Sequence, residues 1–150
     1  MSEAKNIISP QAMHHLTNCG FYDIIEIMGG VAMKENKLVE LSMGFSVDII
    51  NLVKFLKANH ETIISNQIGR SGTSIGANIH EAQYAQGKKD FISKLEIALK
   101  EASETGYWLE LLHRTNYIDS QQYKRLSDKC ASIRIMLIAS CKTAKEKSNG

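Results

Sequence analysis

Residue types that could support catalysis are thinly spread along this chain. The one Glu-x-x-His pair is Glu110 and His113, whereas a di-metal helical bundle uses two such pairs and two further inward-facing glutamates. The run 69–74 superficially resembles a phosphate-binding loop, but it lacks the Gly-Lys-Ser/Thr ending and a preceding strand. No nucleophile, base and orienting acid can be assembled from the remaining residues. The sequence therefore predicts no enzymatic activity, no metal and no cofactor.

Charge is distributed unevenly along the chain. The formal net charge is only +2, but residues 119–150 carry seven basic residues against three acidic ones. Six of these cations are candidates for contacts with the phosphates of RNA or DNA, which position a nucleic acid without reading its sequence. They are Lys124, Arg125, Lys129, Arg134, Lys142 and Lys145. The alternative is a solvated face, because these cations lie on both sides of an apolar stripe.

Another group of polar residues shares one side of a predicted helix. Residues 70 and 81 are eleven positions apart, so at about 100° per residue they lie within roughly 20° of each other around the helix axis. The group consists of Arg70, Ser74, Asn78 and Glu81, and the next predicted helix carries a similar stripe of Lys94, Glu101, Glu104 and Trp108. We expect the two stripes to pair with each other; a ligand site is the alternative.

Helices must position all of these side chains. The single proline, Pro10, lies near the start of the sequence, so nothing after it forbids long helices. Apolar residues recur with helical spacing in four long segments that begin near residues 38, 61, 88 and 119. Because the loops between them are short, we predict an all-α, up-down-up-down four-helix bundle over residues 38–150. Residues 1–37 are predicted to form a separate N-terminal extension with a short helix over 21–29.

Two residues are predicted to mark helix boundaries. Gly87 is expected to end the second helix as a left-handed stop. Asp119 is expected to cap the start of the fourth helix, with Gln122 at the position of a capping-box partner.

Three glycines, Gly69, Gly72 and Gly76, interrupt the second predicted helix. Each costs roughly 0.8 to 1.0 kcal/mol relative to alanine in a helix interior. We expect them to form a groove in which another helix backbone approaches closely. That helix belongs either to a second copy of the chain or to the same bundle.

The cysteines and the hydropathy indicate the compartment. Cys19, Cys130 and Cys141 are odd in number and have no Cys-x-x-Cys spacing, which favours a reducing cytoplasm. No stretch approaches the roughly 20 apolar residues that span a bilayer, and the polar start is not a signal peptide. We therefore expect a soluble, cytoplasmic protein with no membrane contact.

Three runs of sequence point to a known family. They are RSGTSIGANIHEA at 70–82, KKDF at 88–91 and IALKEASETGYWL at 97–109. Together they closely resemble the bacterial four-helix bundle family encoded in intervening sequences of 23S ribosomal RNA genes, over about residues 38–145. The family is also similar to the accessory variability proteins of diversity-generating retroelements. Those proteins assemble as pentameric barrels and bind a reverse transcriptase and nucleic acid.

The resemblance implies a homopentamer of four-helix bundles, without enzymatic activity, whose basic surface meets nucleic acid. Our leading hypothesis is therefore an oligomeric scaffold that binds RNA or DNA. The alternative is a protein-interaction adaptor for a partner such as a reverse transcriptase, with the N-terminal extension as its docking element. A metal-binding bundle enzyme is the third hypothesis.

Overall fold

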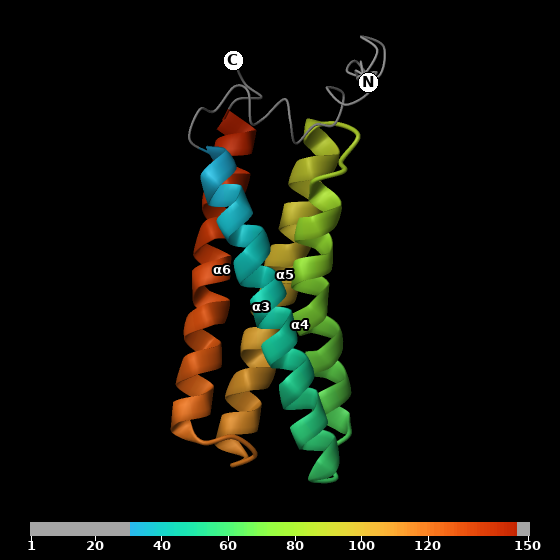
Figure 1. The fold of residues 1–150 in the computed structure, drawn as a ribbon, viewed down its shortest axis with the longest axis vertical. Helices are drawn as coiled ribbons and strands as arrows, with labels where there is room; N and C mark the ends of the chain where they lie inside the picture. Colours follow the sequence, from blue (N-terminus) through green and yellow to red (C-terminus); the bar gives the residue numbers. More distant parts are fainter. Residues whose placement is uncertain (1–30, 147–150) are drawn as a thin grey trace, which may run out of the picture.

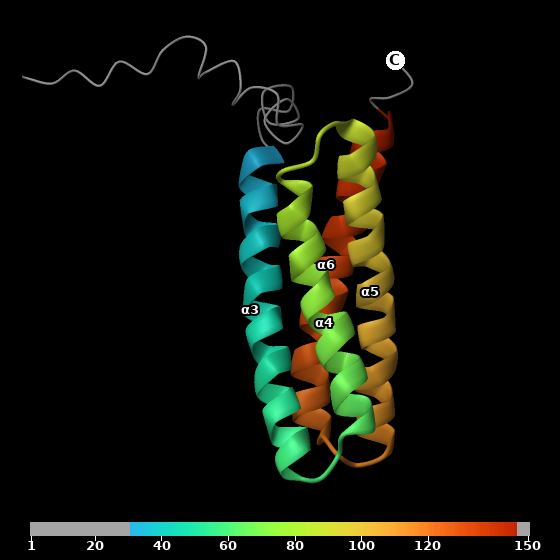
Figure 2. The same cartoon turned by 90° about the vertical axis from the view of Figure 1, so that its right-hand side faces the viewer.

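The computed structural model describes residues 31–146, and describes side chains from residue 37 onward. The expected helix over 21–29 lies outside the described residues, as does Cys19. The described chain forms four helices, which are α3 (Val31–Ala58), α4 (Ile63–Ala82), α5 (Lys88–Arg114) and α6 (Ser120–Glu146). Each helix packs against the next, and α3 also packs against α6 (Figures 1 and 2). The prediction of an all-α, up-down-up-down bundle is confirmed.

The predicted apolar stripes form one continuous core. Phe45, Ile49, Ile75, Leu109 and Leu137 have no exposed surface, and burying each side chain contributes roughly 1.5 to 3 kcal/mol. Among the described residues, none of the helices combines the length and the apolar character needed to span a membrane.

Two helix boundaries differ from the sequence-based expectation. Helix α3 begins at Val31 and not at Leu38, because the segment between them contains good helix formers and no breaker. The predicted boundary between extension and bundle therefore falls inside a helix. Helix α4 ends at Ala82, well before Gly87. Gly87 is not a left-handed stop: its φ is 176°, and it is the N-cap of α5.

The two turns at one end of the bundle share a backbone geometry. His60 and Asn116 have φ values of 61° and 60°, which is the left-handed region. In each turn the following amide bonds a carbonyl five residues back: Glu61 N to Leu56 O and Tyr117 N to Leu112 O, both at 2.9 Å. This is the Schellman arrangement, which satisfies carbonyls at a helix C-terminus. The first residue of α3, the α4–α5 loop and the last residue of α6 lie together at the opposite end (Figure 1).

Acidic side chains accept hydrogen bonds from the first-turn amides of two helices. The Asp119 carboxylate accepts a hydrogen bond from Gln122 N at 2.7 Å, so the predicted N-cap is confirmed. At α4 the N-cap Thr62 makes no side-chain hydrogen bond. The carboxylate of the preceding Glu61 accepts from Ile64 N at 2.8 Å and from Ser65 N at 2.7 Å instead. Helix α4 is therefore capped by a residue that the sequence analysis placed inside it.

Candidate functional site

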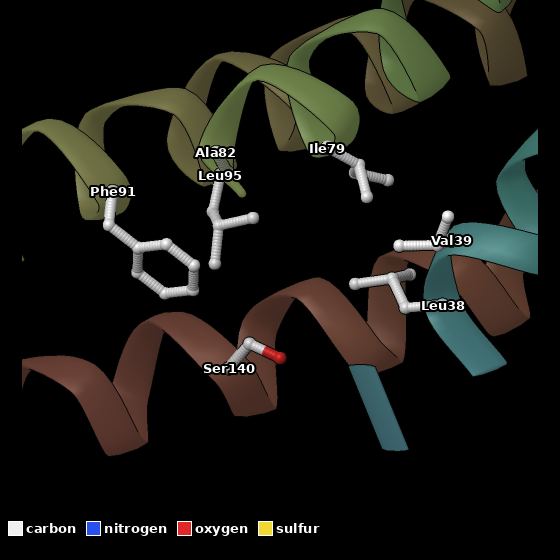
Figure 3. Close-up of a pocket in the computed structure, with 7 residues that line it drawn as sticks. All are labelled: Leu38, Val39, Ile79, Ala82, Phe91, Leu95 and Ser140. Carbon is white, nitrogen blue, oxygen red and sulfur yellow. The ribbon is translucent and has the colours of Figure 1, made fainter. Parts of the chain in front are cut away.

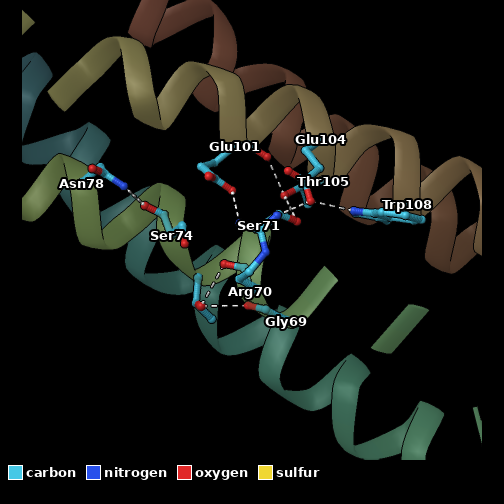
Figure 4. A network of polar contacts seen from close by, with 10 residues as sticks. Gly69, Arg70, Ser71, Ser74, Asn78, Glu101, Glu104, Thr105 and Trp108 are labelled. Atoms are coloured by element: carbon cyan, nitrogen blue, oxygen red, sulfur yellow. Dashed lines mark hydrogen bonds and ion pairs between the residues drawn. The ribbon is translucent and has the colours of Figure 1, made fainter. Parts of the chain in front are cut away.

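The polar residues of α4 and α5 meet on one side of the bundle, and Figure 4 shows most of them. We call this set the polar stripe: Arg70, Ser74, Asn78 and Glu81 of α4 with Lys94, Glu101, Glu104 and Trp108 of α5. Arg70 contacts two of the α5 carboxylates. The Nη1 atom of Arg70 lies 3.5 Å from Glu101 Oε2, and its Nη2 atom pairs with Glu104. Trp108 Nε1 donates to the same Glu104 carboxylate at 3.1 Å. The Arg70 guanidinium and the Trp108 indole thus donate hydrogen bonds to the carboxylates of Glu101 and Glu104.

These contacts change the acidity of the groups involved. The hydrogen bond from Arg70, followed by that from Trp108, lowers the pKa of Glu104 below its ordinary value. The hydrogen bond to Glu104 raises the pKa of the Arg70 guanidinium in turn. Both shifts favour the charged forms, so Arg70 and Glu104 remain an ion pair at neutral pH.

A buried pair of hydroxyl groups lies beneath Arg70. Ser71 and Thr105 are fully buried. The hydroxyl of Thr105 donates to the backbone carbonyl of Glu101 at 2.8 Å and shares a hydrogen bond with the Ser71 hydroxyl at 3.0 Å. Buried polar groups stabilise a fold only when they are paired in this way. The pair therefore fixes the register of α4 on α5 beneath the polar stripe.

Other members of the polar stripe also have partners within the bundle. Lys94 Nζ lies 2.5 Å from Glu81 Oε2, and Asn78 Nδ2 donates to Ser74 O at 2.8 Å within α4. The predicted pairing between helices is therefore confirmed for Arg70 and for Glu81, whereas Asn78 bonds within its own helix. The arrangement supplies charge pairing and helix registration.

The three glycines of α4 face α3. A Cβ atom on Gly69 would lie 3.1 Å from Val53 Cγ2, and one on Gly76 would lie 2.9 Å from Ser46 Oγ. Of the two expectations for these glycines, the structure supports the close crossing inside one bundle. The glycines consequently give no argument for self-association.

The six cations of α6 do not form one continuous surface. Arg125 Nη1 and Lys129 Nζ pair with Asp48 of α3 at 3.0 Å and 2.6 Å, whereas Lys145 pairs with Glu96 of α5 at 2.5 Å. Lys124 and Lys142 pair along α6 with Asp128 and Glu146. Within the described residues, Arg134 alone among the six makes no ion pair. The interhelical ion pairs of these cations lie on two sides of α6, one facing α3 and the other facing α5.

The cations of α6 change the acidity of Asp48. Burial of its carboxyl opposes ionisation, but hydrogen bonds from Lys129 and Arg125, together with their charges, outweigh that effect and lower its pKa. Asp48 and Glu96 were not singled out in the sequence, because each is distant in the chain from its partners on the adjacent helix.

Comparison with known proteins identifies the family. The family model for the 23S rRNA-intervening sequence protein matches residues 34–139. The chain belongs to this family. It is similar to a crystal structure from Bacteroides thetaiotaomicron VPI-5482, described as a protein with unknown function from the S23 ribosomal protein family. The sequences are 53% identical, the TM-score is 0.71, and the match covers 73% of this chain and 98% of that one. Among curated proteins none matches.

The two comparisons leave part of this chain unmatched. Nearly all of the Bacteroides protein is matched, while roughly a quarter of this chain has no counterpart in it. The family model begins at residue 34, so residues 1–33 lie outside the match.

One small cavity lies inside the described part of the bundle. A cavity of about 10 Å³ lies between the four helices, walled by six apolar side chains and Ser140 (Figure 3). This volume holds at most one water molecule. In the described part of the chain, no group of three or more His, Cys, Asp or Glu residues is arranged around a common point. Of the Glu-x-x-His pair, Glu110 pairs with Arg114 and His113 stacks on Tyr123 at 4.6 Å.

Proposed function

We propose that this protein is a non-enzymatic, self-assembling scaffold that binds nucleic acid through phosphate contacts, with the cytoplasm as its expected compartment. The observation that carries the assembly is an uncovered apolar face on α3. Met43, Val47 and Ile50 recur at helical spacing and are 60%, 54% and 42% exposed. They point away from the core residues of the same helix. Exposed apolar faces of this kind mark protein interfaces.

A second apolar face lies on α6, where Ile135 and Ile138 are 67% and 51% exposed. Two different complementary faces on one subunit produce a head-to-tail contact, and such contacts close into a ring when the rotation between subunits permits. The two faces therefore support a ring, and the resemblance to pentameric barrels sets its expected size at five copies.

Light scattering on the purified chain tests the assembly. A homopentamer has five times the chain mass of 16.7 kDa, and a monomeric mass would refute the proposal. M43E/V47E and I135E/I138E each damage one face, so each variant alone should be monomeric. Mixing them should yield a dimer, because each variant retains the face that the other has lost. An unchanged mass in either variant would show that its face is not an interface.

Nucleic-acid binding is supported by the basic excess of residues 119–150. Phosphate contacts release counterions, so the affinity should fall steeply as salt is raised. Electrophoretic shift assays at low salt with structured RNA and with duplex DNA test this part. Absence of any retardation would remove it and leave the assembly proposal standing.

The adaptor is the second candidate function, and the observation that favours it is that residues 1–33 lie outside the family match. Truncation should remove residues 1–30 and not 1–37, because α3 begins at Val31. We expect the truncated chain to retain its mass and its melting temperature but to lose capture of a reverse transcriptase partner in a pulldown. Unchanged capture would exclude the extension as the docking element.

A further inference from the structure

A surface groove lies on α5 and α6, at the end of the bundle where α5 begins and α6 ends. Its larger part has a volume of about 510 Å³ and is lined by Lys88, Lys89, Ile92, Ser93, Glu96 and Lys145. An adjoining depression of about 360 Å³ shares Glu96 and Lys145 and continues past Leu99, Ile138 and Lys142 to Glu146, which pairs with Lys142 at 3.8 Å. We call the two together the lysine groove.

Two lysines of the lysine groove, Lys88 and Lys89, make no ion pair in the described part of the chain, unlike most of the α6 cations. Lys145 is held 2.5 Å from Glu96, and the two side chains are 57% and 43% exposed. Exposed pairs of this kind are weak and exchange readily with other ions. A phosphate could therefore replace the Glu96 carboxylate as the partner of Lys145.

The first turn of α5 adds to the attraction for anions. The N-cap Gly87 provides no side-chain acceptor for the amides of this turn, and a helix N-terminus carries partial positive charge. Asp90 lies in the same turn, but its carboxylate accepts a hydrogen bond from Gln86 N at 3.1 Å. Its hydrogen bond is directed to the loop that precedes α5.

The floor of the lysine groove is apolar. Ile92 and Leu99 of α5 lie between the charged side chains, and neither belongs to the α6 face assigned to the subunit contact. Unpaired bases expose ring faces that a duplex buries, so an apolar floor between cations suits a single strand.

We propose that the lysine groove seats the phosphate backbone of a single-stranded nucleic acid. Lys88 and Lys89 contact one part of the strand, and Lys145 releases Glu96 to contact the next phosphate, towards Lys142. This inference rests on the proposed nucleic-acid binding and assigns it to a site that includes two lysines of α5 and only part of α6.

Fluorescence anisotropy with a short labelled RNA strand, using the full chain from about 50 mM to about 200 mM salt, tests the proposal. We expect K88Q/K89Q to weaken binding about tenfold and to reduce the salt slope by about 1.4, which is 0.7 for each lost phosphate contact. E96Q removes the competing carboxylate and should strengthen binding about threefold. The matched control is K54Q/K57Q, two exposed lysines of α3 near the opposite end of the bundle. It loses the same charge and should change affinity by less than about twofold.

The outcomes separate the site from the function. Equal losses in K88Q/K89Q and K54Q/K57Q, with unaltered melting temperatures, would overturn the lysine groove and leave nucleic-acid binding intact. Failure of the unmodified chain to bind any strand would overturn both proposals. A matched DNA strand distinguishes recognition of phosphate alone, with equal affinity, from recognition of ribose. Equal affinity for a duplex would overturn the assignment to a single strand.

Discussion

A Cβ atom on Gly72 would lie 2.8 Å from Cγ1 and 2.9 Å from Cγ2 of Ile49, a fully buried residue of α3. The separation is shorter than real Cβ contacts, so α3 and α4 touch where α4 has no side chain. G72A should therefore destabilise the protein by roughly 1 to 3 kcal/mol through overpacking, partly offset by the helix preference of alanine. Chemical denaturation measures this change.

The control for this prediction is G44A in α3, where a Cβ atom would meet nothing within 4 Å. It should stabilise the protein by about 0.5 to 1 kcal/mol. Because Gly72 faces the same bundle, G72A should leave the mass from light scattering unchanged. A stable G72A variant with a smaller mass would instead place this glycine at a contact between subunits.

The Asp48 ion pairs predict a specific response to acid. Since the pKa of Asp48 is lowered in the folded protein, the stabilisation is complete above the ordinary carboxyl value of 3.8 and is lost as the pH falls through the lower folded value. D48N should cost about 1 kcal/mol at neutral pH, where Arg125 and Lys129 lose their partner. The difference between D48N and the unmodified protein should vanish in strong acid. A constant difference across the pH range would assign the effect to packing.

Glu61 should contribute more to the start of α4 than the N-cap residue itself. E61A removes both hydrogen bonds to the amides of Ile64 and Ser65, and lost caps cost typically about 1 kcal/mol. T62A should be close to neutral, because Thr62 makes no side-chain cap. Thermal unfolding of the two variants checks the order, and a larger loss in T62A would contradict it.

The buried cysteines should resist modification. Burial raises the pKa of the Cys130 thiol to about 11, and it also raises that of Cys141. The reactive thiolate is therefore scarce at neutral pH. In a C19S background, mass spectrometry after iodoacetamide treatment should show no labelling of the native protein and double labelling in concentrated guanidinium chloride. Rapid native labelling of Cys130 would show that α6 opens readily.

Local chemistry explains which features the sequence predicted. Helical spacing predicted four apolar stripes, whose members Leu109 and Leu137 are fully buried, and it correctly paired Arg70 with the acidic residues of the next helix. Asp119 was identified as a cap because its acceptor and the amide of Gln122 are only three residues apart.

The features that were missed depend on which helices become neighbours and on their rotation. Asp48 meets cations 77 and 81 positions further along the chain, so the basic excess of α6 could not reveal that Arg125 and Lys129 are already paired. The direction in which the glycines face was undecided for the same reason. Lys88 and Lys89 were noticed only as part of the family resemblance, and their position beside Lys145 follows from the antiparallel packing of α5 and α6.

Because the antiparallel helices are even in number, the two ends of the bundle differ. Since α3 starts and α6 finishes at the same end (Figure 1), both ends of the described chain lie on one side of the bundle, and the two Schellman turns lie on the other. In a ring of parallel copies, the first residue of every α3 would lie on a single rim, at the end that also bears the lysine groove. A partner held by one extension would then experience a high effective concentration of the others, and avidity could replace high affinity at each contact.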